Sequence, residues 1–460
     1  MVRSIPPALW RAEALATLAL AWPLILTQLA QMALATIDVL LLGRLGPEAV
    51  AAGALAVNLY NAFMLFGVGV MSATMPMVAR ERGRMSHSVR EVRRTFHQSL
   101  WIAAGLAVLS WIVLWNGEAI CLALGQSPDL SREAGRLLRV LMWSLLPFFA
   151  YVGLRSFVAA MERPLWSLVV GLAAVPVNAA VGWMLIFGEF GAPRLGIVGA
   201  GWATVAANAF MVAALAVVLV ADRRFRRYRL FGRLWRIDGE RCLEFLRLGL
   251  PIGLMIAFES TIFNAAAFLA GLFGTATLAA HAVTLQIASV AFMVPLGLSQ
   301  AVTVRVGLAY GREDARGIAV AGWTGFALVL AFMSTSATIM VTAPRLLVGA
   351  FLDPSDPGGV ETFDLALAFL KLAALFQIVD GVQAVGAGML RGRHDTRVPM
   401  IIALVGYWGI GLVASIVLAF PFDLAGRGIW MGLALGLGSV AVMLMVRWIA
   451  LTRNRTGDER

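Results

Sequence analysis

Long apolar stretches, separated by short polar segments, run through the whole chain of 460 residues. Twelve of these stretches are long enough to be helices that cross a membrane, because about 20 apolar residues span the hydrocarbon core of a bilayer. They lie at 11–41, 48–80, 96–116, 131–161, 165–188, 195–221, 243–272, 276–310, 317–342, 361–390, 397–420 and 427–451. The pattern therefore predicts an all-α integral membrane protein with twelve transmembrane helices.

A narrow polar stripe interrupts the first apolar stretch. Thr27, Gln31 and Asp38 are separated by four and seven residues, so they share one face of a helix. A carboxylate at membrane depth usually faces a bundle interior or a water-filled cavity and marks a functional path. Asp38 is therefore a candidate for binding a cation or a cationic substrate. The alternative interpretation is a local ion pair with Arg44.

The first stretch recurs in the second half of the chain without a gap. Between residues 23–84 and 251–312, 13 of 62 positions are identical. The matching landmarks are Pro23 with Pro251, Gly43 with Gly271, Gly46 with Gly274, Gly83 with Gly311 and Arg84 with Arg312. Landmarks on one constant offset indicate a duplication. The counterpart of Asp38 is Ala266, but the second copy carries Glu259 opposite Gln31, so each half has an acid of its own.

The second half carries two acids at similar predicted depth. Glu259 lies about sixteen residues into its span, and Asp380 lies about nineteen residues into a span that runs the other way. Side chains that could complete a polar cavity in either half are Gln31, Asn58, Asn178, Asn208, Gln286, Gln377 and Gln383. For any one of them the alternative is an interhelical hydrogen bond, and for the two acids it is a structural ion pair. Lys371, nine positions before Asp380, lies on a different face of that helix.

Composition and charge distribution agree with a membrane protein. The chain is 60% hydrophobic and 14% charged, with a mean hydropathy of +0.84. Its formal net charge of +11 would suit a nucleic-acid partner, but the arginines gather in alternate loops, notably 80–97 and 222–247. That is the positive-inside pattern, and it predicts that both termini are cytoplasmic. Three arginines depart from the pattern at the predicted outer start of the fourth span: Arg132, Arg136 and Arg139.

The arginine-rich segment divides the chain into two halves of six spans. Because six is even, both halves enter the membrane from the same side and form parallel repeats. We therefore expect a first lobe at 1–221, a cytoplasmic basic linker at 222–242, and a second lobe with a short C-terminal tail at 243–460.

The sequence lacks the common catalytic motifs. A phosphate-binding loop needs a Gly-Lys-Ser/Thr segment, and the one lysine of the chain is Lys371, between two leucines. The four histidines have no metal-ligand spacing, and no serine lies in a Gly-x-Ser-x-Gly turn. Twelve spans with buried acids and no nucleotide site indicate a secondary transporter rather than an enzyme, with no cofactor beyond a coupling ion.

Four segments of the chain resemble the multidrug and toxic compound extrusion (MATE) family, and three of them are most similar to its NorM branch. The first segment carries Pro23, Gln28, Asp38 and the run Gly43-Arg44-Leu45-Gly46. The other three are Leu250-Pro251-Ile252-Gly253 with Glu259, Asp380-Gly381-Val382-Gln383 through Gly392, and Phe187-Gly188-Glu189-Phe190-Gly191-Ala192-Pro193. The resemblance as a whole covers nearly the entire chain.

The resemblance implies a V-shaped, two-lobed antiporter that exports lipophilic or cationic drug-like compounds in exchange for Na⁺ or H⁺ by alternating access. It assigns coupling or substrate-binding roles to Asp38, Glu259 and Asp380. A buried carboxylate can take up a proton, and a pair of acids beside Gln or Asn oxygens can instead bind Na⁺, so Glu259 and Asp380 are a candidate site for either ion. One departure concerns Gly182, because another branch of the family carries an aspartate four residues after the counterpart of Asn178. We also expect a monomer in the bacterial inner (plasma) membrane, surrounded by lipid and without a nucleic-acid partner.

Other functions remain as alternatives. A flippase for lipid-linked precursors, from the wider related superfamily, should carry basic residues inside its cavity to meet a diphosphate. A major-facilitator transporter also has twelve spans, but its loop between spans two and three typically carries an aspartate in a Gly/Arg signature, which RERGRMSHSVREVRR lacks. A non-transporting scaffold would not explain three buried acids.

Overall fold

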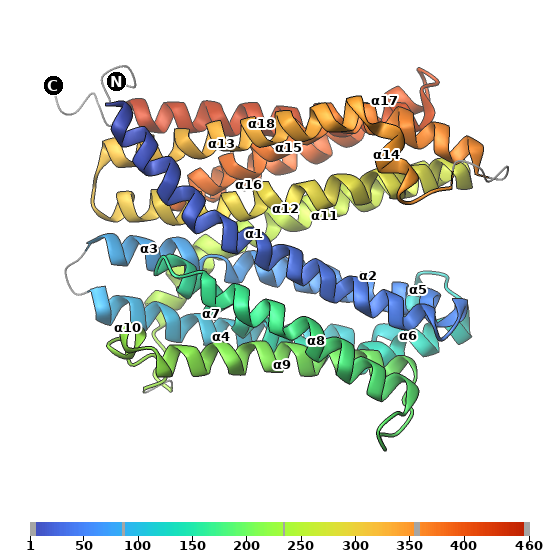
Figure 1. Cartoon of the computed structure of the whole chain (residues 1–460), viewed down its shortest axis with the longest axis horizontal. Coiled ribbons are helices and arrows are strands. Elements are labelled where there is room, and N and C mark those ends of the chain that lie inside the picture. Colours follow the sequence, from blue (N-terminus) through green and yellow to red (C-terminus); the bar gives the residue numbers. More distant parts are fainter. Residues whose placement is uncertain (1–5, 85–87, 233–234, 354–358, 455–460) are drawn as a thin grey trace. The chain divides into compact units, whose positions relative to one another are not determined.

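The computed structural model describes residues 6–84, 88–232, 235–353 and 359–454. Within these residues the chain is almost entirely helical, and no strand occurs (Figure 1). Twelve helical segments are long and apolar enough to cross a membrane, which confirms the predicted number. The end of the predicted C-terminal tail, residues 455–460, lies outside the described residues.

Nine of the twelve spans are single helices. They are α1 (Pro7–Gly43), α4 (Ser88–Leu114), α8 (Leu165–Phe187), α9 (Ile197–Ala221), α11 (Gly239–Leu272), α12 (Thr275–Gly311), α13 (Ala315–Thr342), α15 (Val360–Gly392) and α18 (Ala425–Asn454). Three shorter helices lie in connections between spans: α5 (Gly117–Ala123), α10 (Arg223–Arg226) and α14 (Pro344–Gly349).

The other three spans are built from two or three helical pieces. The second span consists of α2 (Pro47–Met71) and α3 (Thr74–Arg84), the fourth of α6 (Pro128–Leu141), η2 (Met142–Ser144) and α7 (Leu145–Ala160). The eleventh consists of α16 (Arg397–Leu404), the π-helical segment η3 (Val405–Leu412) and α17 (Val413–Ala419). A proline inside a helix removes a backbone hydrogen bond, and α1, α8, α11 and α12 each contain one.

The two halves have the same backbone conformation at Gly46 and Gly274. Each glycine immediately precedes the second helix of its half, α2 or α12, and each has a positive φ, +113° at Gly46 and +107° at Gly274. A residue with a Cβ rarely adopts this conformation, so glycine is required at both positions. These two glycines are matched landmarks of the sequence repeat, so the repeat extends to the backbone conformation.

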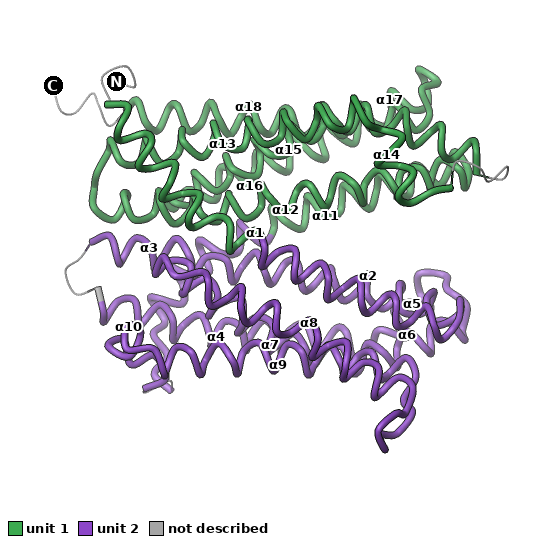
Figure 2. Tube along the Cα trace, in the orientation of Figure 1, with its two compact units in different colours: residues 1–25, 254–460 green, residues 26–253 purple. Residues whose placement is uncertain are grey.

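The chain forms two compact units, which we call unit 1 (residues 1–25 and 254–460) and unit 2 (residues 26–253) (Figure 2). The units do not follow the predicted lobe boundaries, because 1–25 belongs with the second half and 222–253 with the first. Helices α1 and α11 therefore each contribute residues to both units. The two changes of unit, after Ile25 and after Gly253, fall at aligned positions of the duplication. The division of the sequence into two six-span repeats stays a prediction.

Small residues and hydroxyl groups hold α12 against α15 in unit 1. The Ser299 hydroxyl donates to the carbonyl oxygen of Ala384 at 2.6 Å, and the Thr303 hydroxyl lies 3.0 Å from the carbonyl oxygen of Gly388. A Cβ added to Gly388 would lie 2.6 Å from the Ser299 carbonyl oxygen, so the two backbones touch. Close approach through small residues is typical of helices packed in membranes, and here it fixes the part of α15 that follows Asp380.

The second part of α1 is fixed in unit 2 by a buried arginine. Arg155 on α7 is 5% exposed, and its guanidinium donates to the side-chain oxygen of Gln28 at 2.8 Å. The same guanidinium lies 6.0 Å from the centre of the Tyr151 ring. These contacts hold the α1 residues that precede Asp38 against α7.

Candidate functional site

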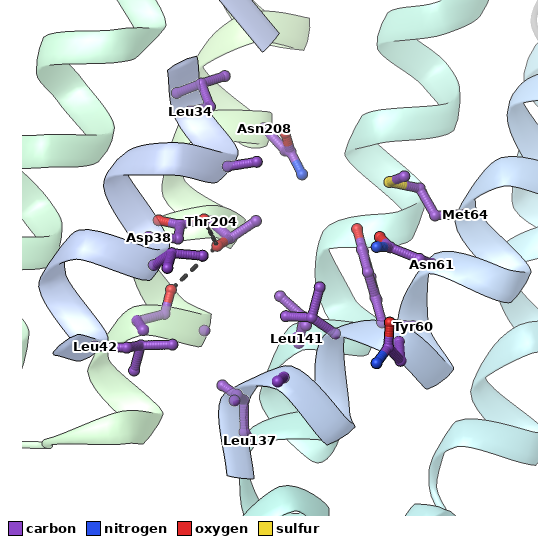
Figure 3. A pocket seen from close by; sticks show the side chains of 18 of the residues that line it. Leu34, Asp38, Leu42, Tyr60, Asn61, Met64, Leu137, Leu141, Thr204 and Asn208 are labelled. Atoms are coloured by element: carbon purple, nitrogen blue, oxygen red, sulfur yellow. Dashed lines mark hydrogen bonds between the residues drawn. The ribbon is translucent and has the colours of Figure 1, made fainter. Parts of the chain in front are cut away.

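A cavity of about 460 Å³ lies within unit 2, between α1, α2, α6 and α9. Its lining is mostly aliphatic, with Asp38 as the one carboxylate and no arginine, lysine or histidine among the described lining residues. In Figure 3, Leu34, Leu42 and Asp38 lie on one side and Tyr60, Asn61 and Met64 on the other. The cavity is therefore an apolar chamber with a single negative group in its wall.

Neutral side chains hold the Asp38 carboxylate. Asn178 on α8 donates to its Oδ1 at 2.7 Å. The Thr204 hydroxyl on α9 lies 3.2 Å from its Oδ2 (Figure 3). Within the described residues no ion pair is formed by Asp38. Hydrogen bonds from neutral donors orient the carboxylate without cancelling its charge, so Asp38 can attract a cation that enters the cavity.

The structure separates the predicted polar residues of the first half into two groups. Gln31, Asn58 and Asn208 line the cavity together with Asp38. Asn178 is buried behind the carboxylate and acts on it through the hydrogen bond.

The alternative ion pair between Asp38 and Arg44 is absent from the described residues. The Arg44 guanidinium instead lies 5.0 Å from the centre of the Trp183 ring, a cation–π distance. The local explanation for Asp38 is therefore wrong, and the acid has no positive partner on the described part of its own helix.

The side chain of Leu41 occupies the space beside Gly182, the position at which another branch of the family carries a second acid. Gly182 is buried on α8, one turn after Asn178, and a Cβ added to it would lie 2.7 Å from Cδ1 of Leu41. An aspartate at this position would have to displace the leucine.

Tyr60 was missed at the level of sequence. Its hydroxyl forms a 2.7 Å hydrogen bond with the Ser144 hydroxyl, and its buried ring belongs to the wall of the cavity. An aromatic residue in an apolar span looks like core packing. The neighbouring Asn58 and Asn61 were the available signs that this part of α2 faces a polar space.

A second polar cluster lies in unit 1 around Asp380 on α15. Asp380, Gln377 and Gln383 are buried, with 6%, 1% and 2% of their surface exposed. The Gln383 amide donates to the Tyr407 hydroxyl at 2.6 Å. Within the described residues, Oδ1 of Asp380 and both amide atoms of Gln377 have no hydrogen-bond partner. Buried polar atoms without partners are rare, and they are suited to bind an ion or water.

Glu259 on α11 belongs to the same cluster. It interacts electrostatically with Asp380, with Arg391 and with Tyr407. The structure therefore brings together the two acids that the sequence placed at similar depth. Within the described residues no ion pair joins Glu259 or Asp380 to a base.

Arg391 is the cationic residue of this cluster that sequence reasoning overlooked. It follows Asp380 by eleven residues, which is about three helical turns, so both lie on one face of α15. The search for a positive partner of Asp380 in its own span considered only the nearest basic residue, Lys371. A helical projection of the whole span would have revealed Arg391.

Gln286 does not join the cluster. Its side chain is exposed on α12, and no described hydrogen bond links it to Glu259 or Asp380. Tyr407, which no sequence pattern singled out, takes part instead. It lies in the π-helical segment η3, and such segments occur frequently at functional sites.

Comparisons with known proteins agree on one family. The MatE family model matches residues 23–184 and 251–417, two segments that begin at the matched prolines Pro23 and Pro251. The chain is 53% identical over 448 residues to a probable multidrug resistance protein NorM of Mesorhizobium japonicum, covering 97% of this chain and 96% of that protein. It is 51% identical over 439 residues to a protein with the same description from Brucella suis, covering 95% and 93%.

Solved structures of low sequence identity share the fold. The crystal structure of the eukaryotic MATE transporter AtDTX14 superposes with a TM-score of 0.86 at 21% identity, covering 97% of this chain and 99% of that one. An outward-facing multidrug resistance MATE transporter superposes with a TM-score of 0.84 at 19% identity, covering 97% and 96%.

Proposed function

Because the chain belongs to the MatE family of multidrug and toxic compound extrusion transporters, we propose that it is a membrane efflux transporter for lipophilic, cationic drug-like compounds. The observation that carries this proposal is the cavity of unit 2. Its aliphatic walls suit an apolar ligand. Asp38, which forms no ion pair within the described residues, supplies one negative charge. A lipophilic cation matches both properties.

Export is coupled to the entry of Na⁺ or H⁺ in this proposal, with no further cofactor. The cluster of the buried Asp380 and the half-buried Glu259 supports it. Two carboxylates close to each other that form no ion pair within the described residues need a cation or a shared proton. Oxygens of Asp380 and Gln377 without partners among the described residues are hard ligands of the kind that Na⁺ takes. Asp38 serves as the substrate-attracting acid of the first half. The absence of a carboxylate at position 182 leaves coupling chiefly to the second half.

The proposal also includes the oligomeric state, the membrane and the orientation of the chain. The chain is a monomer in the inner membrane of a bacterium, surrounded by lipid, with both termini and residues 222–247 in the cytoplasm. The arginine distribution supports this orientation. A flippase for lipid-linked diphosphates is not favoured, because no basic side chain is among the described residues that line the cavity.

Two ions of nearly the same shape and opposite charge provide the test. Purified protein is titrated with tetraphenylphosphonium and with tetraphenylborate. Binding of the cation, but not of the anion, is expected. The variant Val57→Trp, which places a large ring in the cavity wall, should weaken cation binding. Equal binding of both ions, or unchanged binding by the variant, would place recognition elsewhere.

A further inference from the structure

A second hollow, of about 600 Å³, lies in unit 2 at the ends of two spans. One wall is the first three turns of α4, and the other consists of Gly232 and residues 236–240, which lead into α11. Four arginines line it: Arg90, Arg93, Arg94 and Arg236. The hollow is separate from the cavity around Asp38, with which it shares no described lining residue.

Buried side chains of α4 hold the second wall in place. Gln98, 1% exposed, donates its amide to the carbonyl oxygen of Arg236 and accepts from the backbone N–H of Asp238, both at 3.2 Å. His97, 7% exposed, lies 2.6 Å from the carbonyl oxygen of Leu230. These three hydrogen bonds fix the loop against the helix, so the hollow has defined walls.

One of the four arginines, Arg94, forms ion pairs with two acidic residues. Arg94 donates through Nε to Asp238 at 2.8 Å, and through Nη1 to both oxygens of Glu91 at 2.9 and 3.0 Å. The hydrogen bond from Arg94 lowers the pKa of the Asp238 carboxyl below its ordinary value. Asp238 therefore stays ionised and stays bound to Arg94.

The other three arginines are not neutralised by the described part of the protein. Within the described residues, the guanidinium groups of Arg90, Arg93 and Arg236 form no ion pair and no hydrogen bond. The lining acids are Asp238, which is paired with Arg94, and Glu240, which is exposed. Of these, Glu240 alone remains to offset three guanidinium groups, so the hollow carries an uncompensated positive charge.

We propose that this hollow binds the phosphate group of an anionic ligand. Guanidinium groups match phosphate oxygens with paired, charge-assisted hydrogen bonds. Because the hollow opens where α4 and α11 begin, it lies at the depth of lipid headgroups, where basic pockets between spans bind anionic phospholipids. The phosphate can come from an anionic phospholipid or from a soluble phosphate ester, and both present the same chemical group.

A general preference for basic residues in cytoplasmic loops explains how many arginines this region has. It does not explain why three of them line a hollow with defined walls. The short helix α10 provides the comparison, since Arg223, Arg224 and Arg226 belong to the same basic segment and do not line the hollow. Replacing either set removes three positive charges. Only the set in the hollow should affect a specific ligand.

The test measures dissociation constants of the full chain in detergent by calorimetry. The probes are dioctanoyl phosphatidylglycerol, glycerol 3-phosphate and dioctanoylglycerol, which separate lipid phosphate, soluble phosphate and lipid without phosphate. The variants are Arg90→Gln/Arg93→Gln/Arg236→Gln and the matched control Arg223→Gln/Arg224→Gln/Arg226→Gln. The single exposed variant Arg236→Gln covers the case in which the first triple variant does not fold.

Binding of phosphatidylglycerol, of glycerol 3-phosphate or of both, without binding of dioctanoylglycerol, is expected and identifies the source of the phosphate. The hollow variant should bind at least about tenfold more weakly, and the α10 variant should bind as the wild type does. Arg236→Gln should show a smaller loss in the same direction. No binding of either phosphate probe, equal binding of dioctanoylglycerol, or equal losses in the two triple variants would overturn the proposal.

Discussion

Gly69 on α2 and Gly253 on α11 pack so closely that a Cβ added to Gly69 would lie 2.6 Å from the Gly253 Cα. The corresponding contact occurs in unit 1, because a Cβ added to Gly297 would lie 2.9 Å from the Ile25 Cα. In the sequence repeat Gly69 aligns with Gly297, and Ile25 aligns with Gly253. Each contact lies at the last residue before the chain changes unit. The duplicated sequence thus repeats a tertiary contact.

Substitution of Gly69 should therefore destabilise unit 2. In Gly69→Val the new side chain has no space against the α11 backbone, and overpacking of this kind costs about 1–3 kcal/mol. Thermal unfolding of the purified protein, followed by intrinsic fluorescence, measures the loss. Gly105→Val is the matched control, since a Cβ at Gly105 meets no described atom within 4 Å. Equal losses in the two variants would contradict the proposed role of this contact.

Asp38→Asn should weaken binding of tetraphenylphosphonium by a factor of about ten or more, because opposite charges about 4 Å apart in a protein attract each other by about 4 kcal/mol. The amide keeps the size of the side chain, so expression and thermal stability should change little. Titration calorimetry measures the affinity, and Asp364→Asn, an exposed acid on α15, is the control. Unchanged affinity in Asp38→Asn would show that the carboxylate has a structural role.

The local sequence pattern was sufficient to predict the number of membrane-spanning helices and the side of α1 on which Asp38 lies. Hydrophobic stretches fix the number of spans, and the four- and seven-residue spacing placed Gln31 and Asp38 together on the cavity side of α1. Thr27 shares the predicted face but is buried beside Gly171 rather than in the cavity, because the neighbouring helix α8 covers that turn.

Features that depend on distant segments could not be predicted. The side chain of Leu41 fills the space beside Gly182, and residues 6–25 pack with the second half, through contacts that no local period encodes. Arg391 is a different case, since its helical face was available from the sequence. The surroundings of Gln286 could not be predicted, because the presence of a polar residue in a span does not reveal which neighbouring helix it faces.

Labelling of single cysteines should test the orientation. In a chain without Cys121 and Cys242, Trp235→Cys should react with a membrane-impermeant maleimide only after the cells are opened. Phe190→Cys, in the loop after α8, should react in intact cells. Both positions are well exposed, 74% at Trp235 and 90% at Phe190, so access within the protein is not limiting. The reverse labelling pattern would show that the orientation is wrong.

Glu259→Gln and Asp380→Asn should each abolish ion-dependent efflux, and the double variant should be little worse than either single variant. Two acids that share one ion or proton act as a unit, and such residues give non-additive losses. Drug efflux from everted vesicles measures the effect, with Asp364→Asn again as the control. Partial, additive losses with the ion dependence intact would mean that Glu259 and Asp380 do not form one site.

The most direct measurement of coupled export uses wild-type protein in proteoliposomes loaded with a fluorescent lipophilic cation. A Na⁺ gradient and a proton gradient are imposed in separate experiments at the same membrane potential. The account predicts that one of the two gradients drives the dye uphill, that reversing this gradient reverses the movement, and that Asp380→Asn removes the response. Dye movement that is the same with both gradients and with neither would contradict ion-coupled efflux.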